Sequence, residues 1–182
     1  MSGLLICSDI HGDAVSAEKV LDAFKRHGAD RLVILGDILY HGPRNDLPAG
    51  YAPKRVIELL NPYKNSILAV RGNCEAEVDQ MVLDFPVLAD YAFLETDGLR
   101  MLLTHGHVIN KGSCSQLRKG DILLHGHTHV PVAEEFGDRL YYINPGSTSI
   151  PKENSPKSYI YYSNRRFEFF TIDGEKYKEF VI

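Results

Sequence analysis

The sequence has few cysteines. Its 182 residues contain only three, Cys7, Cys74 and Cys114, and no C-x-x-C pair. A disulfide framework uses an even set of cysteines, and a cysteine zinc knuckle uses closely spaced pairs, so the sequence argues against both. We therefore expect reduced cysteines and a cytoplasmic location.

An excess of positive charge is also missing. Twenty Lys and Arg residues stand against 24 Asp and Glu residues, which gives a formal net charge of −4. A protein that coats nucleic acid needs a basic field to release phosphate counterions, so no nucleic-acid coat is expected. A small anionic substrate remains compatible, because bound divalent cations would be the largest local charges in a site.

Long apolar runs are absent as well. No stretch approaches the ~20 apolar residues of a membrane helix, and the start from Met1 has no basic segment ahead of its four-residue apolar run. We expect neither a secretory leader nor a membrane partner. Without a linker or repeat to divide the chain, residues 1–182 are predicted to form a single domain, with a homo-oligomer left open.

Apolar periodicity predicts an α/β fold. A helix over residues 14–27 is expected between Asp13 as N-cap and Gly28 as C-terminal stop, and a second helix begins near Pro53. Strands alternate with helices at first, and hairpins follow later, with Asp97-Gly98 as a strong turn signal. Two facing sheets with helices outside are the expected architecture. The aromatic residues from Tyr159 to Phe170 alternate with polar ones and predict sheet core or a subunit contact.

Polar residues follow five of the predicted strands directly. In open α/β sheets, sites form at the carboxyl ends of strands, so these side chains could meet at one edge of the fold. The seven candidate ligands are Asp9, His11, Asp37, Asn73, His105, His127 and His129.

The residue types indicate a metal site. Carboxylate oxygen, amide oxygen and imidazole nitrogen without thiolate suit Mn²⁺, Fe²⁺, Zn²⁺ or Ni²⁺ better than Ca²⁺ or an iron–sulfur cluster. Seven ligands exceed the need of one open catalytic ion, whereas two ions sharing one carboxylate would use them all.

Each candidate also has a purely structural interpretation. Asp9 could be a helix N-cap, Asp37 and Asn73 could belong to turns, and a lone His105 could be a hydrogen-bonded core residue. Five independent turns that all follow strands and all present ligand-type side chains are an improbable coincidence. The joint pattern therefore favours a metal site.

These motifs resemble a known family. Asp9-x-His11, Gly36-Asp37, Gly72-Asn73, Thr104-His105-Gly106-His107 and Gly126-His127-Thr128-His129 resemble the calcineurin-like metallophosphoesterases. The small size and the run Asn144-Pro145-Gly146-Ser147 look like its branch of small phosphodiesterases. The resemblance implies a four-layer α/β/β/α sandwich of two facing mixed sheets, with a binuclear site that often holds manganese.

The resemblance also implies roles. Asp9, His11 and His129 would hold the first metal, Asn73, His105 and His127 the second, and Asp37 would bridge both. A metal-bridging hydroxide would attack phosphorus and hydrolyse a small phosphodiester, without a covalent enzyme intermediate.

One position departs from the family pattern. The family places a histidine after Gly-Asn, and that histidine is thought to assist the leaving group, but this chain has Cys74, followed by Glu75. A thiol is a weaker donor and cannot become a cation, so Cys74 is either a catalytic residue in the leaving-group slot or a small apolar filler. His107 could contact substrate or be structural. Tyr40, His41, Arg44 and Asn45 lie in a long loop that could carry specificity.

Three alternatives compete with a phosphodiesterase. A phosphomonoesterase is the nearest rival. The retromer-subunit proteins share the family fold as interaction scaffolds but have partly altered metal positions, whereas all seven positions here are ligand-competent. A nuclease of the double-strand-break repair type would be expected to have a larger chain and a basic surface.

Overall fold

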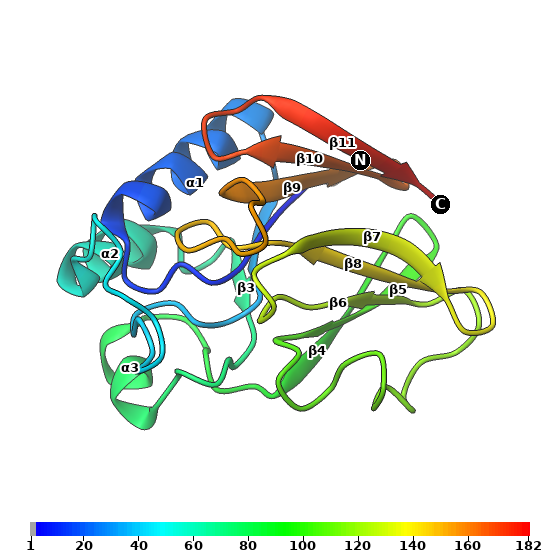
Figure 1. The fold of residues 1–182 in the computed structure, drawn as a ribbon, viewed down its shortest axis with the longest axis horizontal. Helices are drawn as coiled ribbons and strands as arrows, with labels where there is room; N and C mark the ends of the chain where they lie inside the picture. The colour runs from blue at the N-terminus through cyan, green and yellow to red at the C-terminus, as the bar shows by residue number, and fades with distance from the viewer. Residues whose placement is uncertain (1–2) are drawn as a thin grey trace.

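Two β-sheets face each other in the computed structural model, which describes residues 3–182 (Figure 1). Residues 1 and 2, on which the expectation of no leader partly depends, lie outside the described residues. The six-stranded sheet has the order β11-β10-β9-β1-β2-β3, and the five-stranded sheet has the order β4-β5-β6-β8-β7. The predicted α/β sandwich of two sheets is confirmed.

The strands of both sheets run in mixed directions. In the first sheet, β1–β3 are parallel and β9–β11 antiparallel; in the second, β5, β6 and β8 are parallel and the edge strands antiparallel. The first sheet comprises β1 (Leu4–Cys7), β2 (Arg31–Ile34), β3 (Ile67–Ala69), β9 (Ser158–Ser163), β10 (Arg166–Thr171) and β11 (Lys176–Val181). The second comprises β4 (Tyr91–Thr96), β5 (Leu99–Thr104), β6 (Ile122–Leu124), β7 (Pro131–Phe136) and β8 (Leu140–Pro145).

The main helix has the predicted ends. In α1 (Ala14–His27), the Asp13 carboxylate accepts hydrogen bonds from the backbone amides of Val15 and Ser16 at 3.0 and 3.1 Å. Gly28 ends the helix in the left-handed conformation that glycine adopts without strain. The other α-helices are α2 (Pro53–Leu60) and α3 (Glu77–Val82). A 3₁₀ turn, η1 (Asn61–Tyr63), follows α2, and the sequence patterns do not predict this turn.

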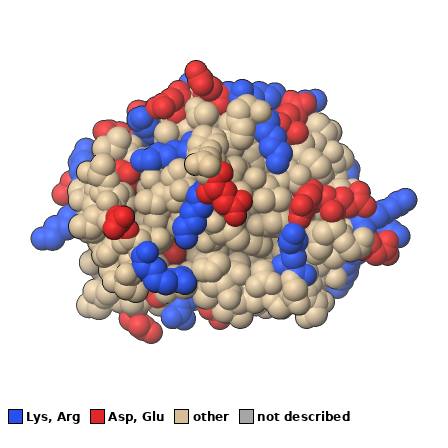
Figure 2. All heavy atoms as spheres, viewed as in Figure 1, with Lys and Arg blue, Asp and Glu red and all other residues tan. Residues whose placement is uncertain are grey.

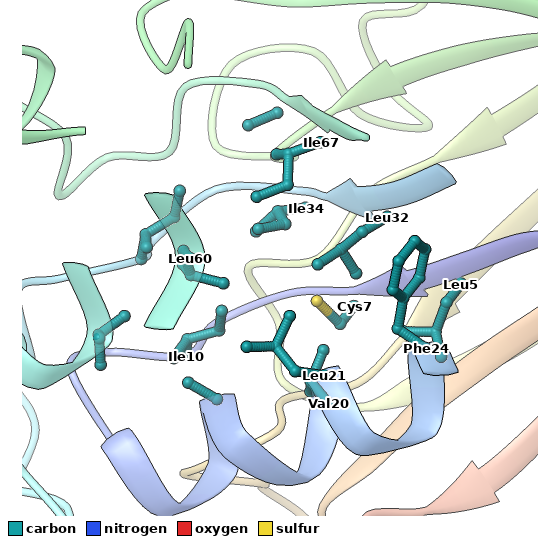
Figure 3. Packing of buried hydrophobic residues seen from close by; sticks show 14 of the residues in the cluster. Leu5, Cys7, Ile10, Val20, Leu21, Phe24, Leu32, Ile34, Leu60 and Ile67 are labelled. Atoms are coloured by element: carbon teal, nitrogen blue, oxygen red, sulfur yellow. The ribbon is translucent and has the colours of Figure 1, made fainter. Parts of the chain in front are cut away.

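The outer core lies between the six-stranded sheet and the helices. Along β1, Leu5 and Cys7 point to this side, because successive side chains of a strand alternate between faces. Figure 3 shows Val20, Leu21 and Phe24 of α1 directed at these strand residues. The helical stripe of apolar residues and the strand alternation therefore fit each other.

The inner core lies between the two sheets. Leu4 and Ile6 of β1 face Leu103 and Leu124 of the second sheet, and all are buried. Tyr162, Phe167 and Phe169 belong to this core and Tyr159 to the outer one. The aromatic run of residues 159–170 is thus sheet core, as one of the two predicted alternatives had it.

A loop covers the outer face of the five-stranded sheet. Ile109, Cys114 and Leu117, from the segment between β5 and β6, pack on Leu102 and Leu123. That segment has glycines at 106, 112 and 120 and lacks a sustained helical apolar pattern. The layer that the family resemblance assigns to helix is therefore formed here by loop.

The surface carries mixed charge. In the view of Figure 2, Lys and Arg side chains are interspersed with Asp and Glu among the described residues rather than gathered into a field of one sign. Among residues 3–182, no helix combines the length and the apolar character that a membrane span requires.

Candidate metal centre

All seven predicted ligands come together at one edge of the sandwich. They lie in the loops that follow the carboxyl ends of β1, β2, β3, β5 and β6. Asp9, His11, Asp37, His105 and His129 are buried, His127 is half-buried, and Asn73 is exposed. The site is therefore closed by protein on its inner side and open to solvent at Asn73.

A first group of ligand atoms surrounds the Asp9 carboxylate. Asp9 Oδ1 lies 3.2 Å from His129 Nε2 and 3.6 Å from His11 Nε2. The two imidazole Nε2 atoms are 3.4 Å apart, and Asp37 Oδ2 lies 3.6 Å from His11 Nε2. Four donor atoms from three loops therefore enclose one small space.

A second group surrounds His105. Its Nε2 atom lies 3.1 Å from Asn73 Oδ1, 3.1 Å from His127 Nδ1 and 3.5 Å from Asp37 Oδ2. Asp37 Oδ2 is thus close to a histidine of each group. The two groups are neighbours that share this carboxylate.

Backbone carbonyls orient three of the histidines. The Nδ1–H groups of His11, His105 and His129 donate to the carbonyls of Tyr40, Leu35 and Ile150 at 2.8, 2.7 and 2.7 Å. A carbonyl can only accept, so Nδ1 holds a proton in each ring and a neutral ring presents the Nε2 lone pair to the cluster. Metal-binding histidines are commonly held in this way.

The ligand loops have an unusual backbone. Asp9, His11, Asp37, His127 and His129 all have positive φ, between 48° and 64°. This left-handed conformation costs roughly 1–2 kcal/mol for an ordinary side chain, and Asp and His are among the residues that tolerate it best. The sharp turns aim consecutive side chains of each loop at the same point.

Two glycines allow the loops to approach one another. A Cβ atom at Gly72 would collide with Asp37 Oδ1, and one at Gly126 would collide with the Ser8 hydroxyl and lie 2.6 Å from Asp9 Oδ2. Both glycines precede a predicted ligand. Their lack of a side chain is therefore a condition for the cluster.

Glu75 fixes the backbone of the loop that carries Asp37. Its Oε2 atom accepts hydrogen bonds from the backbone amides of Asp37 at 2.9 Å and Gly72 at 2.5 Å, and Oε1 accepts from Ile38 at 2.7 Å. Burial and the nearby Asp37 charge raise the pKa of Glu75 to about 7, although the three amides oppose that shift. This residue ties the Asp37 loop to the Gly72–Asn73 loop.

The cluster requires positive charge. Burial alone would raise the pKa of Asp9, but the adjacent His11 and His129 imidazoles hold it well below its ordinary value. Burial alone would lower the pKa of His105. Contact with Asp37 and the charges of the Asp9 and Asp37 carboxylates instead raise it to about 9. Two buried carboxylates are therefore stabilised either by protonated histidine or by bound cations.

Three observations fit bound metal ions. Asp9 Oδ1 is buried and has no hydrogen-bond partner within residues 3–182. The facing Nε2 atoms of His11 and His129 have no proton between them when both rings are neutral. Ligands about 2.0–2.2 Å from one ion lie about 3–3.5 Å from one another, which matches the separations in both groups. The residues present thus fit divalent metal ions.

Cys74 and His107 lie beside the cluster. The backbone N–H of Cys74 donates to Asp37 Oδ1 at 2.9 Å, and its Sγ lies within 4.8 Å of the candidate ligand atoms of His11 and Asp37. Burial and the Asp37 charge raise the pKa of Cys74, so the thiol stays protonated. His107 is exposed, with its ring centroid 5.4 Å from that of His105.

A cleft opens from the cluster towards solvent. Its lining includes His11, Asp37, Asn73 and Cys74, together with Arg44, Asn45 and Lys152. The long loop after Asp37 thus supplies two of its predicted specificity candidates, Arg44 and Asn45. Tyr40 and His41 do not line this cleft; their rings contact each other, and His41 also contacts Tyr51.

The sequence patterns miss several supporting residues. The Ser147 and Ser149 hydroxyls donate to the Asp9 carbonyl at 2.8 and 2.9 Å, and Asn144 Nδ2 donates to the Gly126 carbonyl at 2.9 Å. The Asn-Pro-Gly-Ser run at the end of β8, which the family resemblance had singled out, was the available signal. Lys152 had no signal, since only the folded chain brings its loop to the cleft.

Comparisons with known proteins agree with this geometry. A family model described as the calcineurin-like phosphoesterase superfamily domain matches residues 3–165. The phosphodiesterase YfcE of Escherichia coli K12 is 50% identical over 159 residues, which cover 87% of this chain and 86% of that protein.

Solved structures give the same result. A structure titled as YfcE, a phosphoesterase from E. coli, superposes with a TM-score of 0.95 at 45% identity and covers 99% of each chain. Vps29 of Entamoeba histolytica, solved in complex with zinc, has a TM-score of 0.64 at 20% identity and covers 98% of each chain; it shares the fold alone. The motifs thus predict the correct family, and the similarity lies in its YfcE-like branch.

Proposed function

The chain belongs to the calcineurin-like phosphoesterase superfamily, and we propose that it is a metal-dependent phosphodiesterase that hydrolyses small phosphodiesters. One observation supports this most directly. Two groups of O/N donor atoms at one edge of the two-sheet sandwich share the Asp37 carboxylate. The 50% identity to a phosphodiesterase favours the diester as substrate.

The proposed site holds two divalent ions, with Mn²⁺ as the preferred metal. Asp9, His11 and His129 would hold the first, Asn73, His105 and His127 the second, and Asp37 both. A mixed set of carboxylate, amide and imidazole donors suits Mn²⁺, Fe²⁺, Zn²⁺ or Ni²⁺, and the family resemblance favours Mn²⁺ among them. The bound ions would supply Lewis-acid activation of water as the attacking nucleophile and neutralise charge on the phosphoryl oxygens.

The chain's own residues would prepare the substrate. Arg44 and Lys152 line the cleft and would attract the phosphodiester anion. The carbonyl partners of His11, His105 and His129 keep their rings in one tautomer and one orientation. The protonated Cys74 thiol is a weak donor, so a leaving group that departs as a stable anion suits this site best.

A scaffold is the second candidate, because the family fold that the motifs resemble also occurs in interaction scaffolds. Against it stands the complete ligand set, since a scaffold does not need seven competent donors or five left-handed turns to aim them. The formal net charge of −4 and the mixed charge of the face in Figure 2 argue against a nucleic-acid coat. The free cysteines Cys7, Cys74 and Cys114 favour the proposed cytoplasmic location.

The deciding experiment measures metal content and turnover together. We expect elemental analysis of reconstituted protein to give two transition-metal ions per chain. The same protein with Mn²⁺ should hydrolyse bis(4-nitrophenyl) phosphate faster than 4-nitrophenyl phosphate, and chelation should abolish both rates. One ion or none would contradict the binuclear proposal, and a faster monoester reaction would make the chain a phosphomonoesterase.

A control separates the enzyme from a scaffold or a contaminant. His127→Ala removes a proposed ligand that is only half-buried, so the chain should remain folded by circular dichroism. Turnover should collapse in this variant. An unchanged rate would indicate contamination and favour a scaffold.

A further inference from the structure

A second cavity adjoins the metal cleft. It has a volume of about 400 Å³ and is lined by residues of α2, α3 and the segment after β2. Its walls are mainly apolar and include Tyr40, Tyr51, Ile57, Val78 and Val82. Pockets that bind small molecules usually have such a lining and volumes of about 300–1,000 Å³.

The two cavities meet at Cys74, which lines both. Its backbone N–H donates to Asp37 Oδ1, so the junction is held directly against the carboxylate shared by the two ligand groups. Tyr40, which also lines the apolar cavity, is tied to the same cluster, because its carbonyl accepts the His11 Nδ1–H at 2.8 Å. A substrate with its phosphorus at the cluster would have one substituent next to the apolar cavity.

Charge divides the two cavities. Arg44 and Lys152 line the cleft, whereas the apolar cavity has one residue of each sign, Lys54 and Asp79. The Asp79 carboxylate is already engaged, because it accepts the Ala76 backbone N–H at 2.8 Å. An anion therefore matches the cleft, and an uncharged group matches the apolar cavity.

We propose that the apolar cavity binds an uncharged aromatic or branched alkyl ester group of the phosphodiester whose phosphorus lies at the metal cluster. The proposal rests on the proposed phosphodiesterase function and specifies its substrate class. The exposed side chains of Val78 and Val82 on α3 would then contact the bound ester group.

Two phosphonates test the proposal by binding. Phenylphosphonate and methylphosphonate present the same anion to the cluster and differ only in their substituent. We expect calorimetry on manganese-loaded protein to show the phenyl compound binding at least about tenfold tighter, because even one methylene in an apolar pocket commonly changes affinity by that factor. Equal Kd values would overturn the proposal.

Substitutions on α3 provide the matched test. Val82 lines the cavity and is 40% exposed, whereas its neighbour Met81 is 83% exposed and does not line it. Val82→Asp should reduce the phenyl-to-methyl affinity ratio to about one by placing a charge in the apolar wall. Met81→Asp should leave the ratio at its parent value. An unchanged ratio in Val82→Asp would overturn the proposal.

Two further measurements keep the result interpretable. If circular dichroism shows that Val82→Asp is unfolded, Val78→Asp decides instead, because Val78 also lines the cavity and is 61% exposed. Sedimentation of the parent, Val82→Asp and Met81→Asp tests whether a second copy of the chain covers this face. Dissociation of an oligomer with an unchanged phosphonate ratio would assign the surface to self-association and overturn the proposal.

The binding test is independent of turnover. Failure of the parent to hydrolyse bis(4-nitrophenyl) phosphate would contradict the phosphodiesterase function. Turnover of that diester without any preference for phenylphosphonate would contradict only the apolar cavity as a substrate site.

Discussion

The two ends of the sandwich use the same backbone conformation for different purposes. At the carboxyl ends of the parallel strands, five predicted ligands have positive φ, and four of them are buried. At the opposite end, Asp97, Arg139, Asn164 and Arg165 have positive φ in hairpin turns. Left-handed residues in short hairpin loops simply match the twist of the strands.

The difference lies in what surrounds each turn. A Cβ atom at Gly98 in a hairpin would meet nothing within 4 Å, whereas one at Gly72 would collide with Asp37. Hairpin turns contact few other segments and therefore tolerate substitutions. The turns that carry the ligands pack against one another, some of them across the two sheets. Changes at the ligand end should therefore affect function, and changes at the hairpin end should affect only stability.

The largest effect is expected at Asp37. Asp37→Asn removes the charge that both ligand groups share, so kcat/KM for bis(4-nitrophenyl) phosphate should fall by about 10³-fold or more, at or beyond the upper range for losing one electrostatic stabiliser. Bound metal should fall with it by elemental analysis. Activity similar to that of His129→Ala, which affects one group alone, would show that Asp37 does not bridge.

A glycine pair compares the two ends directly. An alanine in Gly72→Ala would push Asp37 and its loop away from the Gly72–Asn73 loop. Displacement of a catalytic group by about 1 Å can cost about 10²-fold in rate. Gly98→Ala has room but adopts positive φ, so it should cost about 1 kcal/mol of unfolding free energy. Turnover and urea unfolding of both variants check this. Equal rates would remove the contrast between the two ends.

A more moderate effect is expected at Cys74. If the thiol is a passive replacement, Cys74→Ala should leave the rate on an activated nitrophenyl diester nearly unchanged. Cys74→His should accelerate diesters with poor leaving groups by about tenfold or more, because a general acid typically contributes about 10²–10⁴-fold. The dependence of kcat/KM on leaving-group pKa measures this. A dependence that is shallow in the parent and steeper in Cys74→Ala would show that the thiol already acts as the donor.

The smallest effect is expected at a hairpin residue. Asp97 accepts a hydrogen bond from the Tyr162 hydroxyl at 2.9 Å at the end far from the cluster. Asp97→Ala should cost about 1–2 kcal/mol of unfolding free energy through the lost hydrogen bond and the turn conformation. Thermal unfolding and turnover should show lower stability and an unchanged rate per folded molecule. A reduced rate in this variant would mean that the hairpin end influences the metal centre.

Much of the fold follows from local patterns. The helix over residues 14–27 has the ends that Asp13 and Gly28 predict, and Asp97-Gly98 joins β4 and β5 as expected. These features depend on neighbours in the chain, where caps and turns act over a few residues. The loop that covers the outer face of the five-stranded sheet could not be predicted in the same way, because no local pattern in residues 105–121 indicates which sheet face this segment covers.

The seven candidate ligands could be named from the sequence because each follows an apolar strand and has a metal-binding side chain. Their convergence could not be calculated from spacing alone, since Asp9 and His129 are separated by 119 intervening residues and meet through the pairing of strands and the packing of two sheets. Tertiary structure also decided the left-handed turns, the Glu75 hydrogen bonds, the place of Lys152 and the cavity that opens at Cys74. Side-chain chemistry is a property of the residue and is readable one position at a time. Distance and enclosure arise only when chain segments far apart in sequence pack together.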